Sequence, residues 1–207
     1  MIIFLRGLLL VAVGLYLIAL IIAAFFSDQM IFQPQPAGYR DHSSILKLAS
    51  SDGAKISATY LANPDAIFTI LFSHGNAEDI GDDQALLEGI RAAGFAVFAY
   101  DYQGYGTSEG KPSERHAYDD EDAAYNFLVQ SMHIQTNRII ALGRSVGSGP
   151  AADLASRRPV AGLRWKRRRR PVSPAGQLGK VELAAKKSPT QHDATCGLAV
   201  VLPGGCR

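Results

Sequence analysis

The chain has 207 residues, of which 47% are hydrophobic, and a formal net charge of +2. Its length suits one domain with an appendage. Its only cysteines, Cys196 and Cys206, stand near the end of the sequence, which excludes a disulfide framework or thiol site in the rest. The near-neutral charge hides a division. Residues 1–163 carry 11 Lys and Arg against 17 Asp and Glu, whereas residues 164–207 carry 10 against 2.

An uncharged apolar run occupies residues 7–26, after a short N-terminal segment of residues 1–6. About 20 apolar residues suffice to span a bilayer as a helix. A cleaved secretory signal would have a core of ~7–15 residues and a cleavage site of small residues, whereas this run is longer and ends in Phe25-Phe26. We therefore predict an uncleaved, single-pass signal anchor. Arg6 before it and Asp28 after it favour a cytoplasmic N-terminus and a globular part on the non-cytoplasmic side.

A linker over residues 27–40, rich in helix-breaking Pro and Gly, separates this helix from the body. Residues 45–49 and 55–61 then show apolar alternation on either side of Asp52-Gly53. An Asp-Gly pair between two such runs is a hairpin signal. The domain of residues 41–163 should therefore open with two antiparallel strands.

Buried strands and helices alternate in the next part of the chain. Residues 66–73 and 95–100 are continuous apolar runs, as expected of strands covered on both faces. Residues 79–93 have helical apolar spacing, and Pro112-Ser113-Glu114 starts another helix. This alternation predicts an α/β fold with a mainly parallel sheet. Within the second helix, we expect the acidic run 119–122 to be a solvated face rather than a cation site.

A third apolar run ends in Gly143-Arg144-Ser145-Val146-Gly147, ahead of a helix over about 146–156. This is the pattern of a nucleophile elbow, in which a sharp strand-to-helix turn projects a serine hydroxyl. Such a turn brings two backbones together, so the residues two before and two after the serine must be small. Ser145 is the candidate nucleophile. The alternative is a glycine-rich connection without chemistry.

A further strand begins at residues 160–163 but is expected to stop there, at the basic run 164–170. The outer edge of the elbow strand would then be uncovered. Beyond that point we find neither helical nor strand period, apart from a short apolar run over 198–202. We expect 164–207 to be a disordered, frame-shifted or otherwise altered C-terminus of a longer protein. Translating the other two reading frames of the gene would test this.

Three stretches together resemble the α/β-hydrolase superfamily, in the single-pass, membrane-anchored branch whose relatives include protein depalmitoylases. They are Ser73-His74-Gly75-Asn76-Ala77, the loop from Asp101 to Gly110, and Gly143 to Gly147. The resemblance covers about residues 40–163. It implies a partial domain of that fold, acting on an ester, thioester or amide through an acyl-enzyme, with no cofactor and no metal.

Carried over by position, the resemblance makes Ser145 the nucleophile and Gly143 and Gly147 the elbow glycines. The backbone N–H groups of Asn76 and Val146 would form the oxyanion hole. The same resemblance makes His74 a residue that shapes its loop rather than the general base.

The sequence departs from the family in its acid and base. The family order is Ser, then Asp or Glu, then His. After Ser145 the sequence offers Asp153, in the elbow helix, and then Glu182 and His192, which no predicted strand positions, with Asp193 following. We therefore expect activity to be impaired or lost, with Glu182 and His192 as the candidates to complete a triad.

A second hypothesis is a non-catalytic membrane protein whose basic tail binds anionic lipid or nucleic acid. The expected orientation places this tail away from the cytoplasm and so argues against nucleic acid.

Overall fold

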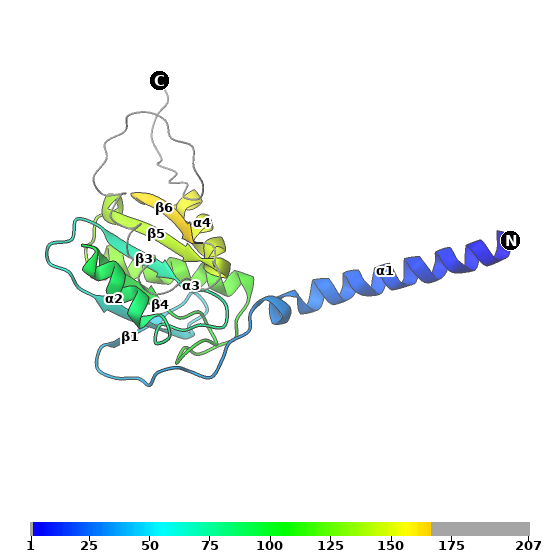
Figure 1. Cartoon of the computed structure of the whole chain (residues 1–207), viewed down its shortest axis with the longest axis horizontal. Coiled ribbons are helices and arrows are strands. Elements are labelled where there is room, and N and C mark those ends of the chain that lie inside the picture. The colour runs from blue at the N-terminus through cyan, green and yellow to red at the C-terminus, as the bar shows by residue number, and fades with distance from the viewer. Residues whose placement is uncertain (1, 167–207) are drawn as a thin grey trace, which may run out of the picture.

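The computed structural model describes residues 2–166. The predicted apolar helix is present as α1, Ile2–Ile31, which projects from a globular body as a single long rod (Figure 1). Its segment Arg6–Ile31 is the one helix in the described part of the chain that is long and apolar enough to cross a membrane. None of its most apolar window is buried against the body, whereas the core helix of a soluble protein would be mostly covered.

The body is built on a six-stranded sheet in the order β1-β2-β4-β3-β5-β6. The first two strands form the predicted antiparallel hairpin, and β2 pairs antiparallel with β4. Strands β4, β3, β5 and β6 are mutually parallel, so the α/β fold with a mainly parallel sheet is confirmed. The strands are β1 Ile45–Ala49, β2 Lys55–Leu61, β3 Thr69–Ser73, β4 Ala96–Tyr100, β5 Ile139–Arg144 and β6 Gly162–Lys166.

Helices cover both faces of the sheet (Figure 1). Successive side chains of a strand point to opposite faces, so the all-buried strand β3 contributes to two apolar clusters. Ile70 and Phe72 belong to the cluster of α2, whereas Leu71 belongs to that of α3 and α4. The helices are α2 Gln84–Ala92, α3 Glu114–Asn126, continued by the π-helical turn Phe127–Ser131, and α4 Ser148–Arg157. Single 3-10 turns at Thr136–Arg138 and Ser145–Gly147 precede and follow β5.

The two predicted helix starts differ in outcome. Helix α3 begins as predicted, and the Ser113 hydroxyl caps it by accepting a hydrogen bond from the His116 N–H. Helix α2 starts at Gln84 rather than residue 79. The Asp79 side chain accepts hydrogen bonds from the backbone N–H groups of Gly81 and Asp82 instead, which holds this segment in a turn.

The prediction that a strand stops after Leu163 is wrong. Strand β6 continues to Lys166 and pairs with β5 from Ile140–Gly162 to Arg144–Lys166. The outer edge of the elbow strand is therefore paired, and α4 packs against both β5 and β6. The edge of β5 offers backbone hydrogen-bond partners to this stretch, and its charged residues do not prevent the pairing, because β-propensity depends strongly on the neighbouring strand. The tail that follows, with Glu182, His192 and the arginine run, lies outside the described residues.

The prediction that the acidic run 119–122 on α3 faces solvent is wrong for two of its four residues. Asp120 and Glu121 are completely buried. Asp120 accepts hydrogen bonds from the Ser50 hydroxyl and the Gln103 N–H, at 2.6 and 2.8 Å, and burial raises its pKa to about 6. The carboxyl of Glu121 lacks a partner within the described residues, and burial raises its pKa well above the usual range. Consecutive residues point around a helix, so two of the four meet the sheet.

Candidate active site

Strand β5 leads directly into the candidate nucleophile. Ser145 follows Arg144, the last residue of β5, and its side chain is exposed. Its φ is +53°, a left-handed conformation that non-glycine residues adopt uncommonly and at some cost. The chain then turns through a single 3-10 turn into α4. The predicted strand, sharp turn and helix are all present, and the serine stands at the turn.

The two glycines around Ser145 stand where no side chain fits. A Cβ on Gly143 would lie 2.5 Å from the Ser148 Cα and would overlap the Gly147 carbonyl oxygen. A Cβ on Gly147 would lie 2.6 Å from the His74 carbonyl oxygen and would overlap that of Ser73. The obstructing atoms are backbone in both cases. The absence of side chains thus lets α4 approach β5 and the end of β3 closely.

The expected oxyanion loop lies beside this elbow. Ser73, the last residue of β3, pairs in register with Gly143 of β5, so residues 74–76 leave the sheet next to the elbow. A Cβ on Gly75 would lie 3.7 Å from the Arg144 carbonyl oxygen. The carboxyl ends of parallel strands in open α/β sheets form the usual site of ligands. The structure thus brings Asn76, Ser145 and Val146 to two neighbouring loops of that edge.

His74 is enclosed beneath this edge rather than facing it. Its ring is fully buried and packs against Tyr102 and Tyr105, with ring centroids 4.4 and 5.2 Å away. Its Nδ1 lies 2.8 Å from the Gly75 carbonyl oxygen, and its Nε2 lies 3.5 Å from Asp101 Oδ1. Burial lowers the pKa of His74 to about 4, so the ring is neutral at physiological pH. This environment suits the loop-shaping role expected of it.

The other histidines of residues 2–166 have partners or positions of their own. His42 contacts Ser44 at the surface, and His116 binds the Lys111 carbonyl oxygen. His133 lines a hollow together with Thr69, the first residue of β3, at the edge opposite Ser145. Among the downstream acids, Asp153 is paired with Arg157 on α4. The described residues thus contain the candidate nucleophile and the candidate oxyanion donors, and we find among them no histidine placed to act as base.

An ion-pair network at Arg144, next to the candidate nucleophile, is a feature that the sequence analysis missed. Arg144 contacts Glu78 at 3.0 Å and Asp83 at 2.5 Å. Glu78 follows the candidate oxyanion loop and Asp83 precedes α2, so one guanidinium ties both to the residue before Ser145. Burial raises the pKa of Asp83 to about 6 despite this pairing. Four acids between residues 78 and 83 were the available signal, but their partner lies more than 60 positions away in the sequence.

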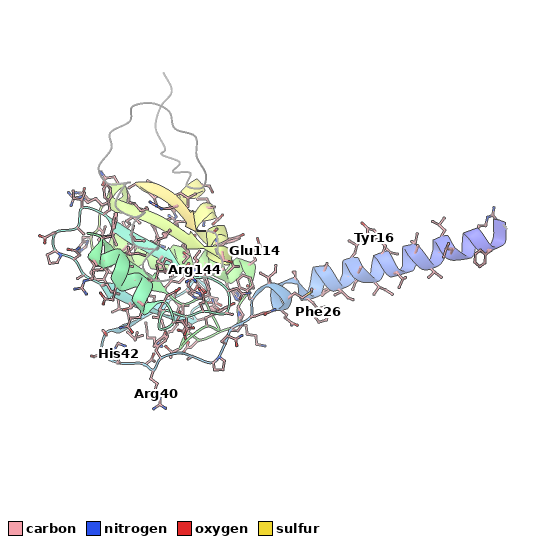
Figure 2. The ribbon with its side chains drawn as sticks, viewed as in Figure 1. Tyr16, Phe26, Arg40, His42, Glu114 and Arg144 are labelled. Carbon is pink, nitrogen blue, oxygen red and sulfur yellow. The ribbon has the colours of Figure 1, made fainter. Side chains whose placement is uncertain are left out.

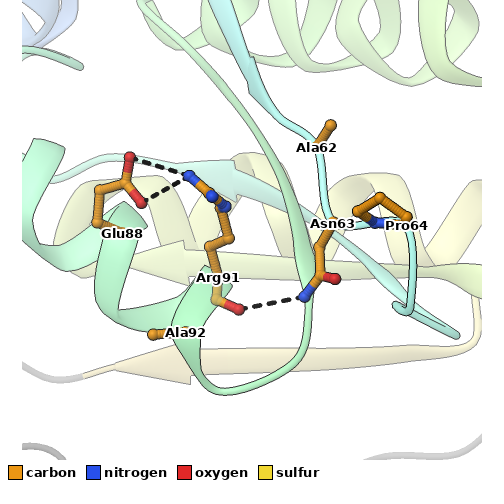
Figure 3. Close-up of a pocket in the computed structure, with 6 residues that line it drawn as sticks. All are labelled: Ala62, Asn63, Pro64, Glu88, Arg91 and Ala92. Atoms are coloured by element: carbon orange, nitrogen blue, oxygen red, sulfur yellow. Dashed lines mark hydrogen bonds and ion pairs between the residues drawn. The ribbon is translucent and has the colours of Figure 1, made fainter.

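The cavity drawn in Figure 3 does not belong to this site. It measures about 260 Å³ and lies between the segment after β2 and the end of α2. Leu61 of β2 pairs with Val97, near the start of β4, so the cavity stands at the amino ends of the parallel strands. Its walls are fixed by the Arg91–Glu88 ion pair at 3.1 Å and a hydrogen bond from Asn63 Nδ2 to the Arg91 carbonyl oxygen.

Comparison with solved structures defines the class of protein. An esterase from Pyrococcus furiosus, Pf2001, is 20% identical, with a TM-score of 0.55 over 63% of this chain and 55% of the esterase. An α/β-hydrolase from Vibrio vulnificus is 25% identical, with a TM-score of 0.52 over 70% of this chain and 56% of that protein. The body therefore has the α/β-hydrolase fold.

Sequence comparison narrows the class to a family. The family model described as serine aminopeptidase, S33 matches residues 62–166, which is half of the chain, and the chain belongs to this family. The Caenorhabditis elegans α/β-hydrolase domain-containing protein aho-3 is 46% identical over 104 residues, 48% of this chain and 30% of aho-3. Human α/β-hydrolase domain-containing protein 17B is 39% identical over 110 residues, 52% of this chain and 38% of that protein.

These matches confirm the resemblance to the α/β-hydrolase superfamily and its depalmitoylase-like branch. The chain spans only about a third of the length of the curated relatives that it matches.

Proposed function

We propose that this chain is a serine hydrolase that cleaves an ester, thioester or amide, with Ser145 as the nucleophile. The observation that carries the proposal is the exposed serine at φ +53°, between two glycines that leave no room for a Cβ. Membership of a hydrolase family supports it independently. The Ser145 Oγ would attack the carbonyl carbon of the substrate, the leaving group would depart, and water would hydrolyse the acyl-enzyme.

The negative charge that develops on the carbonyl oxygen would be stabilised by the backbone N–H groups of Asn76 and Val146. Val146 lies in the turn that opens α4, where N–H groups have no partner within a helix. Loss of one such donor typically costs ~10²–10³ in rate. The chemistry proposed here requires no metal and no cofactor.

Acylation should be slow in this chain, because an unassisted serine hydroxyl stays protonated. Within residues 2–166, the His74 ring is fully buried and His133 lies at the opposite edge of the sheet, while His42 and His116 bind other groups. Glu182 and His192 remain the candidates for acid and base. Oxyanion stabilisation and binding alone can retain ~10³–10⁴-fold catalysis over water when a triad is lost. Strand β6 and the family match both extend to residue 166. The proposed altered C-terminus therefore begins after residue 166 rather than at residue 164.

We further propose that α1 anchors the enzyme as a single-pass helix, with the body on the non-cytoplasmic side. The exposed apolar surface along α1 supports an anchor, because its large side chains are uncovered by the body (Figure 2). The flanking charges Arg6 and Asp28 support the orientation. The substrate would be an acyl compound that reaches this side of the membrane.

Labelling with a fluorophosphonate tests the proposed nucleophile. The full chain in lipid nanodiscs would be compared with Ser145→Ala and with Ser156→Ala, a control at another exposed serine, on α4. We expect slow labelling that Ser145→Ala abolishes and Ser156→Ala retains. A folded chain that is never labelled, or that is labelled equally without Ser145, would refute the proposal.

A further inference from the structure

The end of α1 is bound to the loop that carries the proposed oxyanion donor. The Gln33 N–H donates hydrogen bonds to Asn76 Oδ1 at 2.9 Å and to the Tyr105 hydroxyl at 3.0 Å. In return, Asn76 Nδ2 donates to the carbonyl oxygen of Ile31, the last residue of α1, at 2.5 Å. Between these two residues, Phe32 is buried in the larger apolar cluster. The helix therefore reaches the site through three consecutive residues.

The side chain of Asn76 is the centre of these contacts. Its Oδ1 also accepts from the Tyr105 hydroxyl at 2.7 Å and from the Ala77 N–H at 3.0 Å. The chain turns sharply at Ala77, whose φ is +56°. A carboxamide bound on both its oxygen and its nitrogen cannot rotate freely, so the adjoining backbone of Asn76 is held in one orientation.

A separate contact attaches α1 to the body at another place. Asp28 Oδ1 accepts a hydrogen bond from the backbone N–H of Glu114, the first residue of α3. Glu114 lies on the side of the body where α1 joins it (Figure 2). This bond attaches α1 to α3 without touching the loop that carries Asn76. Mutation can therefore separate the attachment of the helix to the body from its contacts with that loop.

We propose that the Ile31–Gln33 backbone, the Asn76 side chain and the Tyr105 hydroxyl form a clamp that orients the Asn76 N–H toward the site. Asn76, through its side chain, and Tyr105 are positioning residues in this account. The apolar helix is thereby a component of the hydrolytic site as well as an anchor. The clamp itself is a structural claim, whereas its effect on chemistry rests on the function proposed above.

Hydrogen–deuterium exchange of the full chain in nanodiscs tests the clamp. Gln33→Pro removes the N–H that joins the helix end to the loop, whereas Gln33→Ala keeps it. We expect exchange over residues 73–78 to rise about tenfold in Gln33→Pro, as the loss of one or two hydrogen bonds implies, and to stay unchanged in Gln33→Ala. Exchange over strand β4 should stay unchanged in both variants.

Two further variants cover the case in which a proline disturbs the junction. Asn76→Asp keeps the backbone N–H and the Oδ1 acceptor but replaces the donor to Ile31 with a carboxylate oxygen, so it should also raise exchange over 73–78. Asp28→Ala frees α1 from α3 only and should leave that exchange unchanged. The clamp is refuted if neither Gln33→Pro nor Asn76→Asp raises the exchange, or if Asp28→Ala raises it equally.

Fluorophosphonate labelling of the same samples separates the clamp from the chemistry. We expect Asn76→Asp to slow labelling about tenfold relative to Gln33→Ala, by misorienting one donor. Labelling at an unchanged rate would refute the positioning role. If the chain is labelled in none of its forms, the proposed function fails, and the exchange measurements still decide whether the clamp exists.

Discussion

Replacing Gly147 by alanine should destabilise the body by about 3 kcal/mol. The added Cβ would lie 2.6 Å from the His74 carbonyl oxygen and would overlap the Ser73 carbonyl oxygen. Both atoms belong to the backbone at the end of β3, which is paired on both sides. Overpacking against movable side chains costs ~1–3 kcal/mol, so a rigid backbone obstacle places this substitution at the upper end of that range.

Gly149→Ala provides a matched control two residues further along. A Cβ at Gly149 would meet nothing closer than Tyr118 Cε1 at 3.9 Å, and Gly149 lies within α4, where alanine is favoured by up to ~1 kcal/mol. Thermal unfolding of the full chain in nanodiscs would be followed by circular dichroism. The Tm should fall by roughly 10 °C in Gly147→Ala and stay the same or rise slightly in Gly149→Ala. Equal Tm values for Gly147→Ala and the parent would refute the close approach at the elbow.

Two further predictions concern buried charge. Burial raises the pKa of Glu121 in the folded state. The contribution of the protonated carboxyl to folding stability is therefore full below about pH 4.5 and is lost as the pH rises toward the folded pKa. Glu121→Gln should reduce this decline in stability. Urea unfolding at several pH values checks this, and an unchanged slope would contradict it. Arg144→Gln should cost about 2 kcal/mol, because Glu78 and Asp83 lose their shared partner, and Arg144→Lys should recover part of that loss. Equal urea midpoints for the parent, Arg144→Lys and Arg144→Gln would show that the network contributes nothing to stability.

Local sequence patterns were sufficient to predict most of the fold. Apolar alternation around Asp52-Gly53 predicted the first hairpin, and the Ser113 cap marked the start of α3. The limits lay where a distant partner decides the outcome. Strand β6 forms because β5 offers it an edge, and the Asp79 side chain replaces the first turn of α2 by binding nearby N–H groups.

In the candidate site too, features set by neighbouring residues could be predicted from the sequence, whereas those set by distant residues could not. The elbow could be predicted because its glycines and serine are consecutive in the sequence. The positions of Asp120 and Glu121 depended on which side of α3 meets the sheet. The Arg144 network and the contacts of Asn76 with the end of α1 could not be predicted, because each joins residues more than 40 positions apart and leaves no local pattern.

The pH dependence of fluorophosphonate labelling at Ser145 tests the central proposal most directly, namely that Ser145 is a nucleophile that no histidine of residues 2–166 assists. The rate would be measured on the full chain from about pH 5 to 9, with Ser145→Ala as the blank. We expect a slow rate that rises with hydroxide concentration throughout, because burial lowers the pKa of His74 to about 4 and His133 lies at the opposite edge of the sheet. A rate that levels off with a midpoint near pH 6.5–7 would reveal a histidine base. If that levelling persists in His192→Ala, it contradicts the proposal, and if it is lost there, it identifies His192 as the base.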